Sequence, residues 1–202
     1  MKILVFSPYY PPHTGGLESH SDEFNRHLAH NGADMVVFAP HLPETSAIEE
    51  MIYNRVKIIR YPAFEIIPNY PVPKFWKPLF WSQITGLFHS DFDIVISRTR
   101  FFLSSLLALI YAKLTGTRWV HIEHGSDFVK LSSPFKSAIA KIYDHTFGRM
   151  IFRCADQNIS ISRAVQRFIR RFDKRKSPVI YRGIDFENIE SIASPETLPF
   201  PL

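Results

Sequence analysis

Short apolar runs alternate with longer amphipathic stretches along this 202-residue chain. Continuous apolar runs indicate buried strands, and apolar positions spaced three and four residues apart indicate helices. Strands are expected at 2–7, 35–39, 56–61, 92–96, 119–123, 157–161 and 178–181. Helices are expected at 17–30, 78–88, 101–114, 134–153 and 163–172, and the proline-rich stretch 62–81 is interpreted as largely irregular. This alternation predicts a three-layer α/β/α fold around a doubly wound, mostly parallel sheet, with 56–61 at an edge or partly exposed.

Composition restricts the class of protein. Hydrophobic residues make up 46% of the chain and charged residues 21%, which excludes a disordered protein. The mean hydropathy of -0.06 excludes a polytopic membrane protein, and the longest nearly apolar run, 101–112, is shorter than the ~20 residues of a spanning helix. Cys154 is the only cysteine, so an intrachain disulfide is excluded and a reducing, cytoplasmic location is expected.

Positive charge is concentrated in one stretch of the second half. Residues 1–100 carry a net charge of -1 and residues 101–202 a net charge of +6, and 163–176 holds seven basic groups against Asp173. The stretch is interpreted as a solvated helix face, or as a surface for anionic lipid headgroups or a phosphorylated substrate. No nucleic-acid partner is expected, because no nucleic-acid motif accompanies the charge. The candidate anion-binding residues are Arg163, Arg167, Arg170 and Arg171.

A second candidate surface combines aromatic and basic residues. The segment 73–81 contains Lys74, Trp76 and Lys77 among further large apolar side chains. Tryptophan and lysine together suit the headgroup zone of a bilayer, but the same aromatic residues could also pack beneath a long loop.

Ligands of parallel sheets bind beyond the carboxyl ends of the strands, which directs attention to the loops at 8–16, 97–100, 124–132, 162–163 and 182–185. Gly15 and Gly16 end the first of these loops and open a helix, whose unpaired N–H groups suit a phosphate oxygen. A plain turn is the alternative reading. The loop lacks the G-x-G-x-x-G pattern, so a dinucleotide-dependent oxidoreductase is a weak third hypothesis and no cofactor is expected.

The densest polar segment is His121-Ile122-Glu123-His124-Gly125-Ser126-Asp127. His124 falls where strand becomes loop and could polarise a substrate hydroxyl, and Asp127 could do the same or cap the next turn. His121 is expected to be a hydrogen-bonded core histidine. A metal site built from His121, Glu123 and His124 is conceivable, but neighbours on one strand rarely converge on one ion, so no metal is expected.

Three motifs, in this order and spacing, resemble the N-terminal domain of glycosyltransferase family 4 enzymes, which have the GT-B fold. They are the opening KILVFSPYYPPHTGGLE, the segment EHGSD and the later VIYRGID. The resemblance covers residues 1 to 190, and 191–202 would be a linker toward a C-terminal domain that this chain does not include. It implies transfer of a sugar from a nucleotide-sugar to a glycan or lipid-linked acceptor, with retention of anomeric configuration and no essential metal.

The resemblance also assigns site residues. Gly15 and Gly16 would face the donor diphosphate, His124 would contact the transferred sugar, and Asp127 would lie beside the acceptor. Family members usually have a histidine-bearing segment where this chain has Ser97-Arg98-Thr99-Arg100, so Arg98 and Arg100 are expected to bind an anionic acceptor. The donor pocket would need a second domain, and contact with the inner face of a membrane is expected. The alternative function is a non-catalytic module that binds an anionic membrane surface or ligand.

Overall fold

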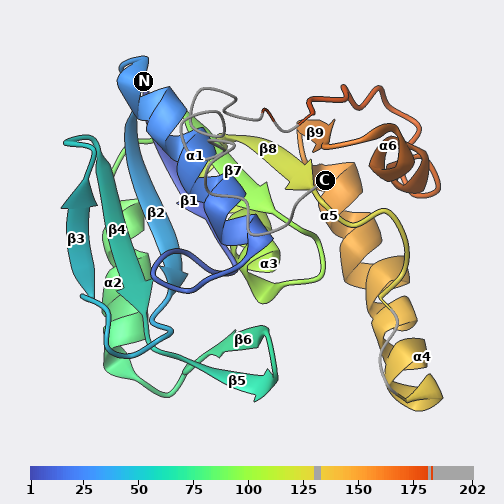
Figure 1. Ribbon diagram of the computed structural model, residues 1–202, viewed down its shortest axis with the longest axis horizontal. Helices are drawn as coiled ribbons and strands as arrows, with labels where there is room; N and C mark the ends of the chain where they lie inside the picture. The colour runs from blue at the N-terminus through green and yellow to red at the C-terminus, as the bar shows by residue number, and fades with distance from the viewer. Residues whose placement is uncertain (130–132, 182, 184–202) are drawn as a thin grey trace, which may run out of the picture.

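The computed structural model describes residues 1–129, 133–181 and 183 (Figure 1). The expected domain boundary at 190, the linker 191–202, and Arg182, Ile184 and Asp185 of the last motif lie outside the described residues. No described helix has both the length and the apolar character that crossing a membrane requires.

A seven-stranded sheet forms the centre of the fold, with the strand order β3-β4-β2-β1-β7-β8-β9. All neighbouring strands run parallel except the β3–β4 pair. The strands are β1 (Lys2–Phe6), β2 (Asp34–Pro40), β3 (Glu49–Ile52), β4 (Val56–Tyr61), β7 (Ile94–Arg98), β8 (Arg118–Glu123) and β9 (Gln157–Ser160).

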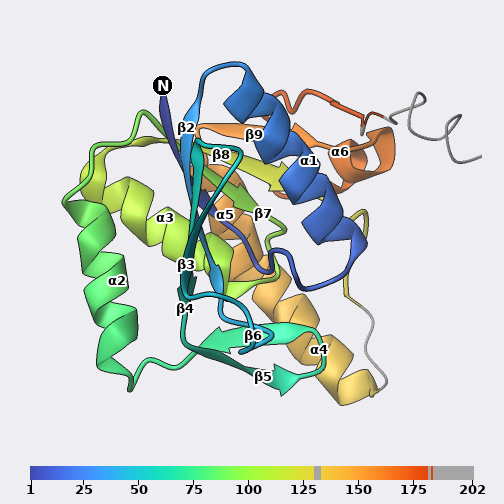
Figure 2. The same ribbon diagram turned by 60° about the vertical axis from the view of Figure 1, so that its left-hand side comes forward.

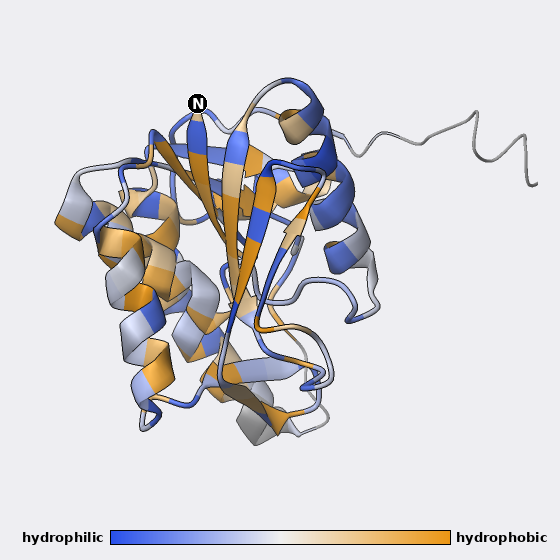
Figure 3. Cartoon of the chain, turned by 90° about the vertical axis from the view of Figure 1, so that its left-hand side faces the viewer, coloured by the Kyte–Doolittle hydropathy of each residue, from blue (hydrophilic) through white to orange (hydrophobic). Residues whose placement is uncertain are grey.

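Helices cover both faces of this sheet, as Figure 2 shows. Helix α1 (Gly16–His30) packs on one face, while α2 (Pro78–Phe88), α3 (Leu103–Thr115) and α5 (Arg149–Cys154) pack on the other. The strands are the most hydrophobic part of the cartoon in Figure 3, because residues on both of their faces are buried. The predicted three-layer α/β/α fold with a doubly wound, mostly parallel sheet is confirmed.

The long helix expected at 134–153 is present but interrupted. It consists of α4 (Pro134–Tyr143), a π-helical turn η1 (Asp144–Gly148) and α5. The last helix, α6 (Arg163–Ile169), ends earlier than the predicted residue 172. The strand expected at 178–181 is reduced to an isolated parallel bridge between Ser160 and Val179.

Two hairpins correct the expectations. Strand β4 is not at an edge, because β3 pairs with it through a turn in which Tyr53 and Asn54 adopt left-handed backbone angles. The stretch interpreted as irregular contains a second hairpin, β5 (Ala63–Ile67) with β6 (Tyr70–Pro73). The prolines in β6 concealed this strand in the sequence. They are tolerated because β6 pairs with a neighbour on one side and is therefore an edge strand.

Candidate functional site

The strand order places a topological switch point between β1 and β7. From β1 the chain adds β2, β4 and β3 in one direction, and then returns to add β7, β8 and β9 in the other. Connections on the two sides of such a point diverge and leave a crevice at the carboxyl ends of the strands. The loops after β1, β7 and β8 therefore meet where a doubly wound sheet binds its ligands.

Helix α1 opens at this edge without a capping side chain. Gly15 is its N-cap residue, and no side chain caps the first turn. The Glu18 carboxylate is buried and lies beside Gly15, so that a Cβ on Gly15 would come within 2.2 Å of Glu18 Oε2. The same carboxylate lies 2.8 Å from His13 Nδ1. A Cβ on Gly16 would meet nothing within 4 Å, so Gly16 leaves its side of the helix N-terminus open.

His124 lies at the same edge and contacts α1. Its Nε2 is 3.4 Å from Nδ1 of His20, which stands one helical turn after Gly16, and its Nδ1 is 3.3 Å from Thr99 Oγ1. Burial, followed by the positive charge of Arg98, lowers the pKa of His124 to about 3. His124 is therefore a neutral imidazole at physiological pH, which donates a hydrogen bond from one ring nitrogen and accepts one at the other.

The backbone beside His124 is strained. Thr99 has a φ of 60°, and a β-branched residue rarely adopts left-handed angles. Its N–H donates to Ile122 O at 3.0 Å, which ties the loop after β7 to β8 beneath His124. Strain of this kind is often found at functional sites.

A buried ionic network supports the loop that carries His124. The Glu123 carboxylate accepts hydrogen bonds from the backbone N–H groups of Arg100, His124 and Gly125 and from Arg100 Nη1 at 3.1 Å. Burial would raise the pKa of Glu123, but the charge and backbone N–H of Arg100, together with His121, lower it to about 2. Arg100 also binds Asp144 through Nε and Nη2, both at 2.9 Å. The π-helical turn begins at Asp144 and keeps its carboxylate directed at Arg100.

The two arginines predicted to bind an acceptor differ in their surroundings. Every side-chain nitrogen of Arg100 donates to a protein oxygen, so Arg100 holds the loop and offers no free nitrogen to a ligand. Arg98 is fully buried and donates from Nη2 to Asn25 Oδ1 at 3.0 Å. Its Nε and Nη1 have no hydrogen-bond partner among the described residues. Burial lowers the pKa of Arg98 to about 10, so the side chain remains a cation at neutral pH.

The ion-pair partner of Asp127 lies in the segment that follows α6. Asp127 Oδ1 lies 3.7 Å from Arg171 Nη1 in an exposed ion pair. Arg163, Arg167 and Arg170 are also exposed on this side of the molecule. A groove of about 430 Å³ lies there between α5 and α6, and basic side chains line it, among them Arg149, Arg153, Arg170, Arg171 and Lys174.

The aromatic segment forms a separate surface. Trp76 is 65% exposed and packs on Phe64 of β5, with ring centroids 5.5 Å apart. Lys77 is exposed, and Lys74 pairs with Glu44 at 2.9 Å. Figures 1 and 2 draw the start of α2 and helix α6 at opposite ends of the molecule, so the two predicted surfaces are not one continuous face.

His121 is the core histidine that the sequence predicts. It is fully buried, and its ring nitrogens lie 2.8 Å from Ser97 Oγ and 3.2 Å from Glu123 Oε2. Within the described residues, no group of three or more His, Cys, Asp or Glu side chains is arranged to hold a metal ion.

Sequence reasoning missed two residues of the site, His20 and Thr99. His20 reads as one polar position on an amphipathic helix, and only the packing of α1 over β8 brings it to His124. Nothing in the local sequence marks Thr99, because left-handed positions are usually signalled by glycine, asparagine or aspartate and threonine rarely adopts them.

Solved structures with this architecture are glycosyltransferases of the GT-B fold. Sucrose-phosphate synthase from Thermosynechococcus elongatus superimposes with a TM-score of 0.67 at 15% identity, over 92% of this chain and 49% of that one. HepE from Anabaena, in complex with UDP-glucose, superimposes with a TM-score of 0.55 at 15% identity over 93% and 45%. MurG from Acinetobacter baumannii gives 0.52 at 11% identity over 89% and 44%. At these identities the likeness concerns the fold.

Sequence comparison identifies the family. The Glycosyltransferase Family 4 sequence model matches residues 14–188, and the chain belongs to that family as its N-terminal-like domain. The uncharacterized glycosyltransferase MJ1069 of Methanocaldococcus jannaschii is 48% identical over 197 residues, covering 95% of this chain and 50% of that protein. The chain thus spans about half the length of the curated relative it matches.

Proposed function

We propose that this chain is the acceptor-binding N-terminal domain of a retaining glycosyltransferase of hexosyltransferase type, which moves a sugar from a nucleotide-sugar to a glycan or lipid-linked acceptor. The observation that carries the proposal is the meeting of three loops at the switch point. There the uncapped start of α1 lies one helical turn from His20, which contacts His124. Retention of configuration at the anomeric carbon is inferred from the family resemblance.

The donor would lie across the start of α1. Its diphosphate would accept hydrogen bonds from the N–H groups of the first turn, where the helix dipole favours negative charge. Gly16 leaves room for this approach, and the neutral His124 would hydrogen-bond a hydroxyl of the transferred sugar. A second domain would supply the nucleotide pocket. HepE, which superimposes on this chain over 45% of its own length, was solved in complex with UDP-glucose.

The acceptor would lie on the β7 and β8 side of the crevice. Asp127 remains a proposed acceptor contact at its rim, and Arg98 remains the proposed cation for an anionic acceptor, because two of its nitrogens have no partner among the described residues. We assign Arg100 to loop structure instead. The surface around Trp76 is a proposed contact with the cytoplasmic face of a membrane, and the basic groove beside α6 is a proposed surface for an anionic ligand.

The proposal is tested by assaying sugar transfer to lipid-phosphate acceptors. A panel of nucleotide-sugars is offered to the purified chain, alone and with the C-terminal half of a family member supplied in trans. Transfer is expected only in the second case, and the anomeric configuration of the product, read by NMR, should match that of the donor. Vesicle binding that is lost on reversing the charges of Arg167, Arg170 and Arg171, with no nucleotide-sugar bound under either condition, would instead support the non-catalytic alternative.

The two glycines should respond differently to alanine. Gly15→Ala displaces the Glu18 carboxylate and its contact with His13, and is expected to lower the free energy of unfolding by about 1 kcal/mol. Gly16→Ala meets open space and is expected to leave stability unchanged or slightly raised, because alanine favours a helix. Urea unfolding measures both.

Donor affinity separates a ligand role for Gly16 from a structural one. Titration of nucleotide-sugar into the complemented enzyme should show weaker binding for Gly16→Ala despite its intact stability. An unchanged affinity would show that Gly16 does not contact the donor. The two glycines would then be explained by a plain turn before the helix.

A further inference from the structure

An apolar groove of about 360 Å³ lies outside the residues assigned so far. Ile66 and Tyr70 of the β5–β6 hairpin form one wall, Ile139 and Tyr143 of α4 form the other, and Phe101 of the loop after β7 also lines the groove. Its volume falls within the range of small-molecule sites, roughly 300–1,000 Å³. Figures 1 and 2 both draw the hairpin and α4 at the end of the molecule toward which β1 and β2 point.

The tyrosines turn their polar atoms away from this groove. Tyr70 donates its hydroxyl hydrogen to Phe101 O at 3.1 Å, and Tyr143 donates to Arg100 O at 3.4 Å. Their rings therefore present carbon to the groove while the hydroxyls bond to the loop after β7. An occupant of the groove meets apolar side chains and gains no hydrogen bonds from the two tyrosines.

The groove borders the loop after β7, which also carries residues of the candidate site. Phe101 follows Thr99 by two residues, and Thr99 Oγ1 lies 3.3 Å from His124 Nδ1. The buried cation Arg98 ends β7 at the start of the same loop. An apolar groove beside a loop that carries a buried cation is complementary to a molecule with a hydrocarbon tail and an anionic head.

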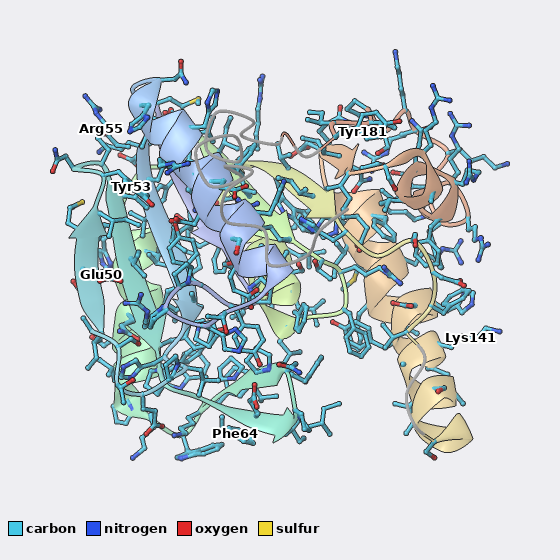
Figure 4. All side chains as sticks on the ribbon, viewed as in Figure 1. Glu50, Tyr53, Arg55, Phe64, Lys141 and Tyr181 are labelled. Carbon is cyan, nitrogen blue, oxygen red and sulfur yellow. The ribbon has the colours of Figure 1, made fainter. Side chains whose placement is uncertain are left out.

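Two of the residues that line the groove are exposed apolar side chains. Ile66 is 64% exposed and Ile139 is 52% exposed, and both also line the groove. Phe64, on the same hairpin, contacts the exposed Trp76. Figure 4 labels Phe64 on the hairpin and shows Lys141 of α4 pointing away from it, toward the α6 side. The groove mouth is thus apolar, and the neighbouring surface carries the aromatic side chain that suits a bilayer interface.

We propose that this groove binds the hydrocarbon chain of a lipid-phosphate acceptor, with the phosphate end directed toward Arg98 and His124. The inference rests on the proposed function and specifies its acceptor class. A hydrocarbon chain would pass from the bilayer into the groove along an apolar path, and burial of its surface would supply binding energy that does not depend on the sugar.

Binding of dodecyl phosphate, kept below its micelle concentration, tests the proposal by calorimetry on the 202-residue chain. Ile139→Asp places a carboxylate in the groove wall and is expected to weaken binding by at least about tenfold. Ile142→Asp is the matched control, because Ile142 is on the same helix, is 64% exposed and does not line the groove. Its affinity should stay within about twofold of the wild type. Inorganic phosphate at the same concentration should show far weaker binding.

A diazirine at the tail end of the probe locates the bound chain. Crosslinks mapped by mass spectrometry are expected within 66–70 and 139–143. If Ile139→Asp fails to fold by circular dichroism, Ile66→Asp on the opposite wall replaces it, with the same expected loss. Absence of binding, an equal loss in Ile142→Asp, or crosslinks elsewhere would overturn the proposal. So would self-association that Ile139→Asp abolishes, because the groove would then be covered by a second copy.

This binding measurement needs no sugar transfer. A His124 variant that binds the probe normally but transfers no sugar supports both proposals. Probe binding at the groove, with no sugar transfer even when the C-terminal half is supplied, would contradict the proposed function alone. Transfer by the complemented enzyme that is indifferent to Ile139→Asp would contradict the groove alone.

Discussion

Replacement of Arg100 by methionine is expected to lower the free energy of unfolding by about 3–5 kcal/mol, because it leaves two buried carboxylates without the cation they share. Glu123 and Asp144 are both fully buried, and Arg100 donates to each of them. Methionine preserves much of the side-chain volume, so the loss reports the charge rather than a cavity. Urea unfolding followed by circular dichroism measures it.

The exposed ion pair between Arg171 and Asp127 provides the control. Both side chains are more than half exposed, at 57% and 61%, so Arg171→Met is expected to cost less than about 1 kcal/mol. The triple variant Arg100→Met, Glu123→Gln, Asp144→Asn removes all three charges and should be more stable than Arg100→Met alone. A loss below 1 kcal/mol for Arg100→Met would show that the network contributes little.

Acidification should change the free energy of unfolding of the wild type and of Arg100→Met in opposite directions. In the wild type the folded-state pKa of Glu123, about 2, lies below that of an unfolded glutamate. Its stabilising contribution is therefore present above roughly pH 4.3 and is lost as the pH falls further. Without Arg100, burial raises the pKa of this carboxyl above the unfolded value. The difference in unfolding free energy between the wild type and Arg100→Met should then shrink as the pH is lowered from about 7 to 4.

Sugar transfer by the complemented enzyme is expected to fall about 100-fold or more in kcat/KM on His124→Ala, within the range for loss of a positioned hydrogen-bonding group. His124 is held between Thr99 and His20 at the edge where the start of α1 lies. Its neutral ring would contribute a hydrogen bond of fixed direction. The unfolding midpoint should change little, because both contacts are long.

His89→Ala is the matched control, since His89 is exposed at the end of α2 and is expected to leave transfer unchanged. The pH profile adds a second readout. With its pKa lowered to about 3, His124 stays neutral from pH 5 to 8, so its protonation should not reduce the rate in that range. Wild-type kcat/KM in the alanine variant, or an acid limb near pH 6.5 that the substitution abolishes, would contradict this role.

Local pattern was sufficient to predict most of the architecture. The buried strands at 2–7 and 35–39 are built on continuous apolar runs, and Gly15 and Asn31 flank the helix α1 that the sequence predicts at 17–30. Strand β3 escaped prediction because two of its four residues are glutamates. The β5–β6 hairpin escaped because its prolines are typical of loops, and pairing of two segments is not visible in either one.

The sequence by itself determined the fold class, the family motifs, and the positions of Gly15 and Gly16 at a helix start and of His124 at a strand end, because periodicity and turn chemistry are local properties. Tertiary structure alone decided which polar side chains are free to bind. It paired Arg100 with Glu123 and Asp144, buried Arg98 beside Asn25, and brought His20 to His124. Burial and charge pairing depend on residues distant in the chain, and they determine whether an arginine supports a loop or remains available to a ligand.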